Sequence, residues 1–187
     1  MKNLKKVIIP IAGYGLRMLP ATKAIPKELL PLVGKPVIHY VVDEALKSGF
    51  SEIIFVTQES KKSVESYFKS NKKLELILKE KKNNSLLNEV KEISNFRIKI
   101  RSVLQKNPKG LGHAILQAKT LIKGEPFAVM LPDMILDSDY EKENLVLMKK
   151  NFETSGESSI LLGKVKKSDV KSYGIAKLKN NIRKNNF

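Results

Sequence analysis

Two short apolar segments, each followed by an amphipathic helix pattern, dominate the first third of the sequence. Residues 5–13 (KKVIIPIAG) and 51–58 (SEIIFVTQ) are continuous apolar runs, which are typical of strands covered on both faces. Residues 34–50 and 60–70 have the spacing of amphipathic helices, and Gly49 supplies a stop for the first of them. This strand–helix–strand–helix order predicts an α/β protein with a parallel sheet and right-handed crossover connections.

The rest of the sequence extends this pattern over one domain, predicted at residues 1–178, with a polar tail at 179–187. Apolar spacing within residues 72–94 predicts two helices, broken near Asn83 and inserted over one edge of the sheet. The same reasoning predicts a half-exposed strand at 96–103, a helix at 110–122, a buried strand at 125–133, a helix at 141–154, and strands at 158–163 and 173–178. We therefore expect a mostly parallel sheet flanked by helices.

The chain carries a large excess of positive charge. Its 35 Lys and Arg residues against 19 Asp and Glu residues give a formal net charge of +16. A basic surface attracts polyanions. However, the lysines are spread through the whole sequence, and no aromatic residues alternate with them as a base-stacking surface would require. We therefore expect a small polyphosphate ligand and no specific nucleic-acid partner.

The sequence contains no cysteine, so disulfides and thiolate metal sites are excluded and a reducing compartment is the natural setting. It also has no apolar run of the ~18 residues that a membrane-spanning helix needs. The apolar run near the N-terminus is too short for a signal peptide. We expect a cytoplasmic protein with no membrane partner, and the sequence leaves open whether it forms a homo-oligomer.

A glycine-containing loop follows the first predicted strand. Gly13 and Gly15 stand beyond the carboxyl end of that strand, where open α/β sheets bind ligands, and glycine lets backbone N–H groups approach a base or phosphate. The chain has no G-x-x-x-x-G-K-[ST] sequence, and Met18 stands where a Rossmann G-x-G-x-x-G needs its last glycine. Those two phosphate loops are therefore excluded, and a plain strand-to-loop turn stays an alternative.

Two cations and several prolines distinguish this loop from an ordinary turn. Arg17 and Lys27 bracket a segment whose conformations are restricted by Pro20, Pro26 and Pro31. A guanidinium and an ammonium held at the same strand ends suit a triphosphate, whose charge a single residue would not balance. A solvated basic loop is the alternative interpretation.

The stretch "AGYGLRMLPATKAIPKELLPLVGKPVIHYVVDEAL" resembles the nucleotide loop of the bacterial sugar-1-phosphate nucleotidyltransferases, whose pattern is G-x-G-[TS]-R-M-x-P-x-T-x-x-x-P-K. The later stretches "KGLGHAILQAK", "VMLPDMILD" and "SYGIAKL" are similar to that family in the same order, so the resemblance covers residues 4–178. It implies a Rossmann-like (GT-A-like) sheet and the Mg²⁺-dependent transfer of UMP from UTP to glucose-1-phosphate, giving UDP-glucose and pyrophosphate. The alternatives are an enzyme for dTTP or another sugar-1-phosphate, and an inactive nucleotide-binding fragment.

The resemblance also implies roles for residues of the loop. Such in-line transfer needs positioning and charge neutralisation more than covalent catalysis. Arg17 would hold the leaving β- and γ-phosphates, and Lys27 would neutralise charge on the transferring phosphate and the sugar phosphate. The nucleotide would be contacted by backbone groups of Ala12, Gly13 and Gly15. The carboxylate of Glu28 would lie near the nucleotide.

Four residues outside the loop complete the predicted site: Gln105, Gly110, Asp133 and Gly174. The amide of Gln105 and the backbone of Gly110 can match the donors and acceptors of uracil. Asp133 ends a predicted strand, where a carboxylate can bind Mg²⁺ together with substrate phosphates, although a turn or helix cap is the alternative for this residue taken alone. Gly174 would let the backbone approach the glucose.

The sequence departs from the family pattern in two places. Leu16 replaces the Thr or Ser that usually follows the second glycine, so one hydroxyl contact to phosphate is absent. Family members continue past the "YGIAKL" stretch into a Glu-Lys-Pro segment and a later Asp, whereas this sequence reads "KNNIRKNNF" at residues 179–187. We therefore expect the N-terminal, nucleotide-binding part of such an enzyme, incomplete at its C-terminus and without full activity of its own.

Overall fold

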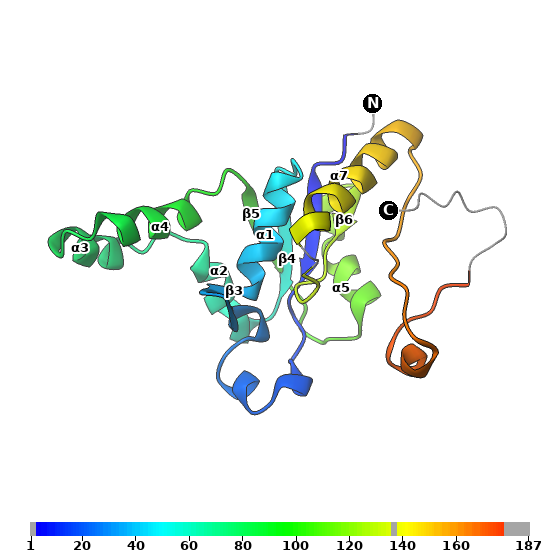
Figure 1. Cartoon of the computed structure of the whole chain (residues 1–187), viewed down its shortest axis with the longest axis horizontal. Coiled ribbons are helices and arrows are strands. Elements are labelled where there is room, and N and C mark those ends of the chain that lie inside the picture. Colours follow the sequence, from blue (N-terminus) through cyan, green and yellow to red (C-terminus); the bar gives the residue numbers. More distant parts are fainter. Residues whose placement is uncertain (1–2, 136–137, 178–187) are drawn as a thin grey trace.

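A four-stranded parallel sheet lies at the centre of the molecule (Figure 1). The structure is a computed structural model that describes residues 3–135 and 138–177. Every neighbouring pair of strands is parallel. The strands, in their order across the sheet, are β5 (Lys99–Leu104), β4 (Glu52–Thr57), β1 (Lys6–Pro10) and β6 (Phe127–Val129). The predicted α/β class is therefore confirmed, and the carboxyl ends of all four strands meet at one end of the sheet.

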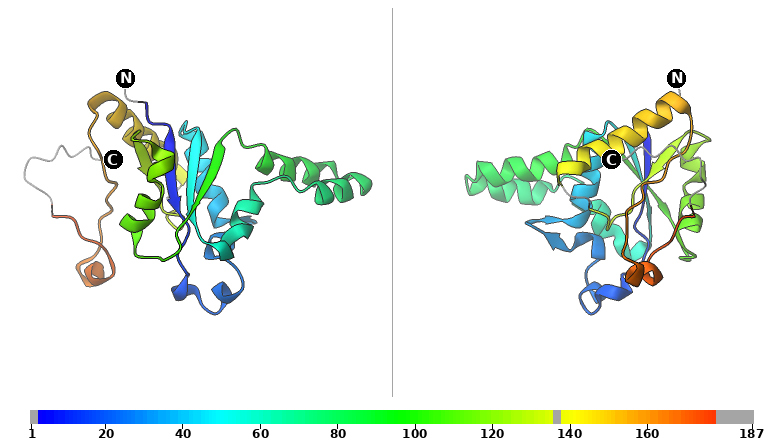
Figure 2. Two further views of the ribbon diagram at one scale, coloured as in Figure 1. Left: turned by 180° about the vertical axis from the view of Figure 1, so that it is seen from behind. Right: turned by 45° about the vertical axis from the view of Figure 1, so that its right-hand side comes forward.

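Helices cover both faces of this sheet (Figure 2). α1 (Val37–Lys47) and α7 (Ser138–Ser155) pack on one face, where Val7 and Phe55 belong to the core. α5 (Leu111–Gln117) and α6 (Lys119–Ile122) pack on the other face, against Ile8 and Ile54. Because successive strand residues point to opposite faces, the apolar runs of β1 and β4 are buried on both sides.

The connections at the carboxyl end of the sheet are built from short elements. The chain between β1 and α1 contains three 3₁₀ turns and a two-stranded hairpin: η1 (Leu16–Met18), η2 (Ala21–Lys23), η3 (Lys27–Leu29), β2 (Pro31–Leu32) and β3 (Lys35–Pro36). After β4, η4 (Glu59–Lys61) leads into α2 (Lys62–Tyr67), whose Val64 joins the core beside α1. These connections therefore carry most of the residues predicted to bind the nucleotide.

His39 of α1 is buried against α2. Its Nδ1 lies 3.0 Å from the hydroxyl of Tyr67, and its ring contacts the rings of Tyr67 and Phe96. Burial lowers the pKa of His39, and the positive charge of Lys35 lowers it further. Burial also raises the pKa of Tyr67 to about 12. Both side chains are therefore neutral in the folded protein at neutral pH.

We expect the free energy of unfolding to fall as the pH drops below about 6.5, because the unfolded chain then binds a proton at His39 that the folded chain does not. The urea midpoint should be lower at about pH 5.5 than at about pH 7.5. In His39→Gln this difference should shrink. An equal difference in the two proteins would place the pH dependence at other groups.

The region of residues 72–94 forms a helical hairpin that projects from the β5 side of the sheet (Figure 1). Its helices are α3 (Lys72–Glu80) and α4 (Asn84–Ser94). Each begins at an asparagine cap, because the side chains of Asn71 and Asn83 each accept a hydrogen bond of 3.1 Å from the backbone N–H three residues later. The predicted break near Asn83 is confirmed, and the hairpin extends away from the sheet rather than over its edge.

Two predicted elements near the site are shorter in the structure. The helix predicted at 110–122 is divided at Ala118 into α5 and α6. The buried strand predicted at 125–133 is only the three-residue β6, and both Phe127 and Val129 are 38% exposed. Among the described strands β6 pairs only with β1, so its outer side is uncovered and the prediction of a buried strand is wrong.

The segment after α7 does not form the two strands predicted at 158–163 and 173–178. Among the described residues it contains only the 3₁₀ helix η5 (Lys167–Ser172), and Ile160 is 82% exposed. A strand needs the backbone groups of a neighbouring strand, and the described part of the chain offers this segment no such neighbour. The helix predicted at 141–154 is confirmed within α7, whereas Leu178 and the predicted tail at 179–187 lie outside the described residues.

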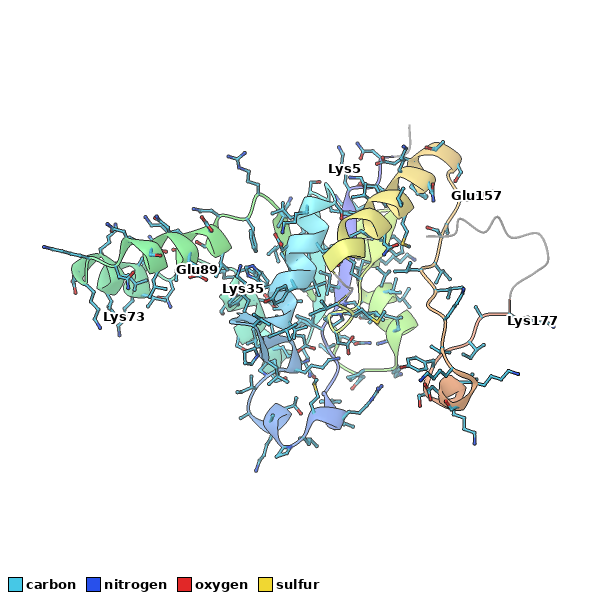
Figure 3. All side chains as sticks on the ribbon, in the orientation of Figure 1. Lys5, Lys35, Lys73, Glu89, Glu157 and Lys177 are labelled. Atoms are coloured by element: carbon cyan, nitrogen blue, oxygen red, sulfur yellow. The ribbon has the colours of Figure 1, made fainter. Side chains whose placement is uncertain are left out.

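Charged side chains are spread around the molecule (Figure 3). Lys73 lies on the projecting hairpin, Lys5 near the start of β1, and Lys177 at the opposite side of the molecule from the hairpin. This distribution matches the dispersed lysines of the sequence. In the part of the chain that the structure describes, no helix is both long and apolar enough to cross a membrane.

Candidate active site

The loop after β1 folds back on itself at Gly15. The φ angle of Gly15 is +69°, and a Cβ atom there would lie 3.1 Å from Cγ2 of Thr22 and 3.3 Å from Cβ of Lys27. The hydroxyl of Thr22 donates a hydrogen bond of 2.9 Å to the carbonyl of Gly15. Glycine tolerates both this backbone conformation and this close approach. Gly15 therefore brings the turn that carries Lys27 next to the end of β1.

The chain leaves the sheet at Ala12 and Gly13. The N–H of Ile11 donates a hydrogen bond of 2.8 Å to the carbonyl of Val56, which extends the pairing of β1 and β4 by one residue. Ala12 is still buried, whereas Gly13 is exposed, and no described atom lies within 4 Å of the position that a Cβ of Gly13 would take. Of the backbone predicted to contact the nucleotide, the Cβ side of Gly13 therefore faces open space at the carboxyl end of β1.

Lys27 and Asp133 meet at this end of the sheet. The Nζ of Lys27 lies 2.6 Å from Oδ2 of Asp133, although the two residues are 106 positions apart. The Lys27 side chain is 20% exposed and the Asp133 side chain 57%. Asp133 reaches this place because the chain after β6 stays on the sheet, with the N–H of Met130 donating to the carbonyl of Ile8 at 3.0 Å. The structure thus brings together a predicted catalytic cation and the predicted metal ligand.

Arg17 and Gly174 lie at the periphery of this arrangement. Arg17 is exposed on η1, within the same loop as Lys27. Gly174 is exposed in the segment that follows η5, and Figure 1 shows η5 set apart from the loop of residues 11–30. The phosphate contact of Arg17 and the glucose contact of Gly174 stay predictions.

Glu28 has a partner that the sequence did not predict. It is 1% exposed, and both of its carboxylate oxygens accept hydrogen bonds of 2.8 Å from Nζ of Lys61 in η4. The same ammonium donates a third hydrogen bond, of 2.6 Å, to the carbonyl of Gly13. Lys61 thus links the carboxylate of Glu28 to the backbone of Gly13 within the same loop, and the predicted place of Glu28 near the nucleotide stays a prediction.

Lys61 is the residue of this site that the sequence did not reveal. It is 4% exposed. Burial lowers the pKa of Lys61, against the hydrogen bond and charge of Glu28, which raise it. The only available signal was its position in the connection after the second strand, since such connections meet at the carboxyl end of a parallel sheet. A lysine within "ESKKS" otherwise resembles any surface lysine.

Gln105 is held by a histidine. It follows β5, is 3% exposed, and its N–H donates a hydrogen bond of 2.8 Å to the carbonyl of Thr57. Its Nε2 lies 2.8 Å from Nδ1 of His113 in α5, while Nε2 of His113 lies 3.2 Å from the amide nitrogen of Gln117. Gly110 precedes α5 with a φ of +94°. The structure therefore places Gln105 and Gly110 together at the start of α5, and the amide of Gln105 is fixed by His113.

The chain matches a known protein family and is similar to a curated relative. A family profile described as "Nucleotidyl transferase" matches residues 6–187. The chain is 47% identical over 180 residues to the UTP–glucose-1-phosphate uridylyltransferase of Escherichia coli K12, an alignment that covers 95% of this chain and 59% of that protein. The chain therefore spans about three fifths of the length of the curated relative.

Two solved structures from Acinetobacter baumannii are similar in fold. One is a UDP-glucose pyrophosphorylase, with a TM-score of 0.88 and 40% identity, over 95% of this chain and 63% of that one. The other is a UTP-bound UGPase, with a TM-score of 0.79 and 42% identity, over 82% of this chain and 54% of that one. Together with the family profile over residues 6–187, these likenesses show that the chain belongs to the nucleotidyl transferase family.

Proposed function

We propose that this chain forms the nucleotide-binding part of an enzyme that transfers UMP from UTP to glucose-1-phosphate and releases pyrophosphate. The observation that carries the proposal is the contact between Lys27 and Asp133 at the carboxyl end of the sheet, beside the exposed backbone of Gly13. A cation and a carboxylate at this place suit a triphosphate with a divalent ion. The names of the relatives, and the UTP bound to one similar structure, support this choice of substrate.

In the proposed reaction, an oxygen of the sugar phosphate attacks the α-phosphorus of UTP while the bond to the β-phosphate oxygen breaks. Negative charge then grows on the leaving pyrophosphate and around the α-phosphorus. The ammonium of Lys27 is already held at the sheet end by Asp133, so it would offset this charge with little rearrangement. Arg17, exposed in the same loop, would hold the leaving β- and γ-phosphates.

Asp133 fits a Mg²⁺ ion that is shared with the substrate. Mg²⁺ is usually bound by one or two carboxylates together with substrate phosphates, and the carboxylate of Asp133 is 57% exposed beside the ammonium of Lys27. In the described parts of the chain, no group of three or more His, Asp or Glu side chains could hold a metal ion. We therefore propose that Asp133 holds Mg²⁺ jointly with the phosphates of UTP, where the ion would neutralise phosphate charge.

Gln105 and Gly110 are the proposed contacts of the uracil ring. A buried amide that must pair with the base can reject a base that lacks the matching donors and acceptors. The contact with His113 fixes the orientation of this amide, which makes Gln105 a suitable reader of the base.

A cytoplasmic location, formation of a homo-oligomer and the single domain of residues 1–178 stay predictions.

The proposed function is tested with two proteins: this chain, and an extended enzyme in which it is joined to the C-terminal part of the Escherichia coli relative that it does not match. We expect the extended enzyme to release pyrophosphate from UTP and glucose-1-phosphate, and the chain alone to bind UTP with Mg²⁺ in calorimetry. A larger kcat/KM with dTTP than with UTP would overturn the substrate assignment. A folded extended enzyme with neither turnover nor UTP binding would contradict the proposed function.

A further inference from the structure

We propose that Lys61 is a positioning residue that fixes the nucleotide loop before any nucleotide binds. The effect on nucleotide affinity rests on the proposed function, whereas the effect on the loop itself does not. Lys61 lies in η4, after β4, and contacts two places in the connection between β1 and α1. It therefore joins two of the loops that meet at the carboxyl end of the sheet.

All three donors of the Lys61 ammonium are used within the protein. An ammonium has three N–H groups. Its nitrogen lies 2.8 Å from each carboxylate oxygen of Glu28 and 2.6 Å from the carbonyl oxygen of Gly13. Lys61 and Glu28 are both buried, at 4% and 1% exposure. Because neither group can turn to water instead, this arrangement holds both residues in one geometry.

The contacts of Lys61 lie next to residues with proposed functions. Glu28 belongs to η3, the same turn as Lys27, so anchoring its side chain also anchors the backbone from which Lys27 reaches Asp133. Gly13 is one of the residues whose backbone is predicted to contact the nucleotide. The hydrogen bond from Lys61 holds its carbonyl, while the space on the Cβ side of Gly13 is open. Lys61 thus sets the distance between the backbone of Gly13 and the turn that carries Lys27.

Stability alone is a weak reason for such an arrangement. Two buried charges lose hydration, and a buried ion pair can often be replaced by apolar side chains without loss of stability. An apolar pair would fill the same space, but it could not hold the Gly13 carbonyl. A positioning role and a purely structural role therefore predict different results when both charges are removed together.

The test compares Lys61→Met with the pair variant Lys61→Met/Glu28→Met in the 187-residue chain. The single variant leaves Glu28 buried without its partner, so its urea midpoint should fall. The pair variant should regain most of that loss. Its affinity for UTP with Mg²⁺, measured by calorimetry, should nevertheless stay about tenfold or more below that of the unaltered chain, because the loop is no longer positioned.

Hydrogen exchange without nucleotide provides the second measurement. The N–H of Met18 donates to Gly15 at 2.9 Å and that of Leu29 donates to Pro26 at 2.8 Å, so both amides report on the folded loop. In both variants these amides should exchange about tenfold faster or more, while amides of the central strands should not change in the pair variant. If neither the unaltered chain nor the folded extended enzyme binds UTP or shows turnover, the proposed function fails, and this exchange still tests Lys61.

Lys6→Met is the matched control. Lys6 is also buried, and its ammonium also contacts one carboxylate, that of Glu125, and backbone carbonyls, those of Leu121 and Ile122. It lies at the opposite end of β1 from the loop, so UTP affinity and loop exchange should not change. A pair variant with normal affinity and normal loop exchange would overturn the positioning role. If the methionines prevent folding, Lys61→Gln/Glu28→Gln makes the same comparison. It removes both charges, and a glutamine side chain, one bond shorter than that of lysine, would not reach the carbonyl of Gly13.

Discussion

Replacing Lys27 with methionine is expected to lower the kcat of the extended enzyme for pyrophosphate release by about a hundredfold to a thousandfold. Methionine keeps much of the length of the side chain but removes the cation that lies 2.6 Å from Asp133. A charge that acts mainly on the transition state lowers kcat more than it raises KM. The measurement is the dependence of initial rate on UTP and glucose-1-phosphate concentration.

Lys23→Met is the control for this variant. Lys23 lies in η2 of the same loop and is exposed, so its loss removes an equal charge without touching the contact with Asp133. It should keep most of the activity. The urea midpoint of Lys27→Met should also stay near that of the unaltered chain, since Asp133 is 57% exposed and remains hydrated without its partner. Equal activity of both variants and the unaltered enzyme would exclude Lys27 from catalysis.

The meeting of Lys27 and Asp133 was within reach of the sequence because Lys27 lies in the loop after one predicted strand and Asp133 ends another. Apolar runs and helix spacing predicted β1, α1, β4 and α2, and parallel strands bring their carboxyl ends to one end of the sheet. Gly15 was predicted as a loop glycine. Its closeness to Thr22 and Lys27 depends on how the loop folds back, which local patterns do not specify.

The parts that the sequence did not predict depend on contacts between distant segments. Lys61 is buried because Glu28, 33 positions away, pairs with it, and no local pattern marks a lysine for such a partner. The strands predicted at 158–163 and 173–178 have suitable apolar residues, but a strand also needs a neighbour, which the described residues do not provide. The contact between His113 and Gln105 likewise joins a helix to the end of a strand, and no local pattern predicts it.

Replacing Asp133 with asparagine is expected to change how UTP binding depends on Mg²⁺. Asparagine keeps the shape of the side chain but loses the charge that a divalent ion requires, so affinity for UTP in the presence of Mg²⁺ should fall by about tenfold to a hundredfold. Without Mg²⁺, affinity for UTP should stay the same or rise, because a negative charge beside the triphosphate is gone and Lys27 is released from its ion pair.

Calorimetry of UTP binding with and without Mg²⁺ measures both effects, and Asp43→Asn is the matched control. Asp43 forms an ion pair with Lys47 within α1, so it is a carboxylate paired with a lysine, as Asp133 is. Asp43 lies on a helix, away from the carboxyl end of β6 where Asp133 lies. Its loss should leave both affinities unchanged. A loss of UTP affinity that occurs only with Mg²⁺ separates a metal ligand from a structural residue, since a disturbed loop would weaken UTP binding under both conditions. An equal loss with and without Mg²⁺ would therefore show that Asp133 only holds Lys27 in place.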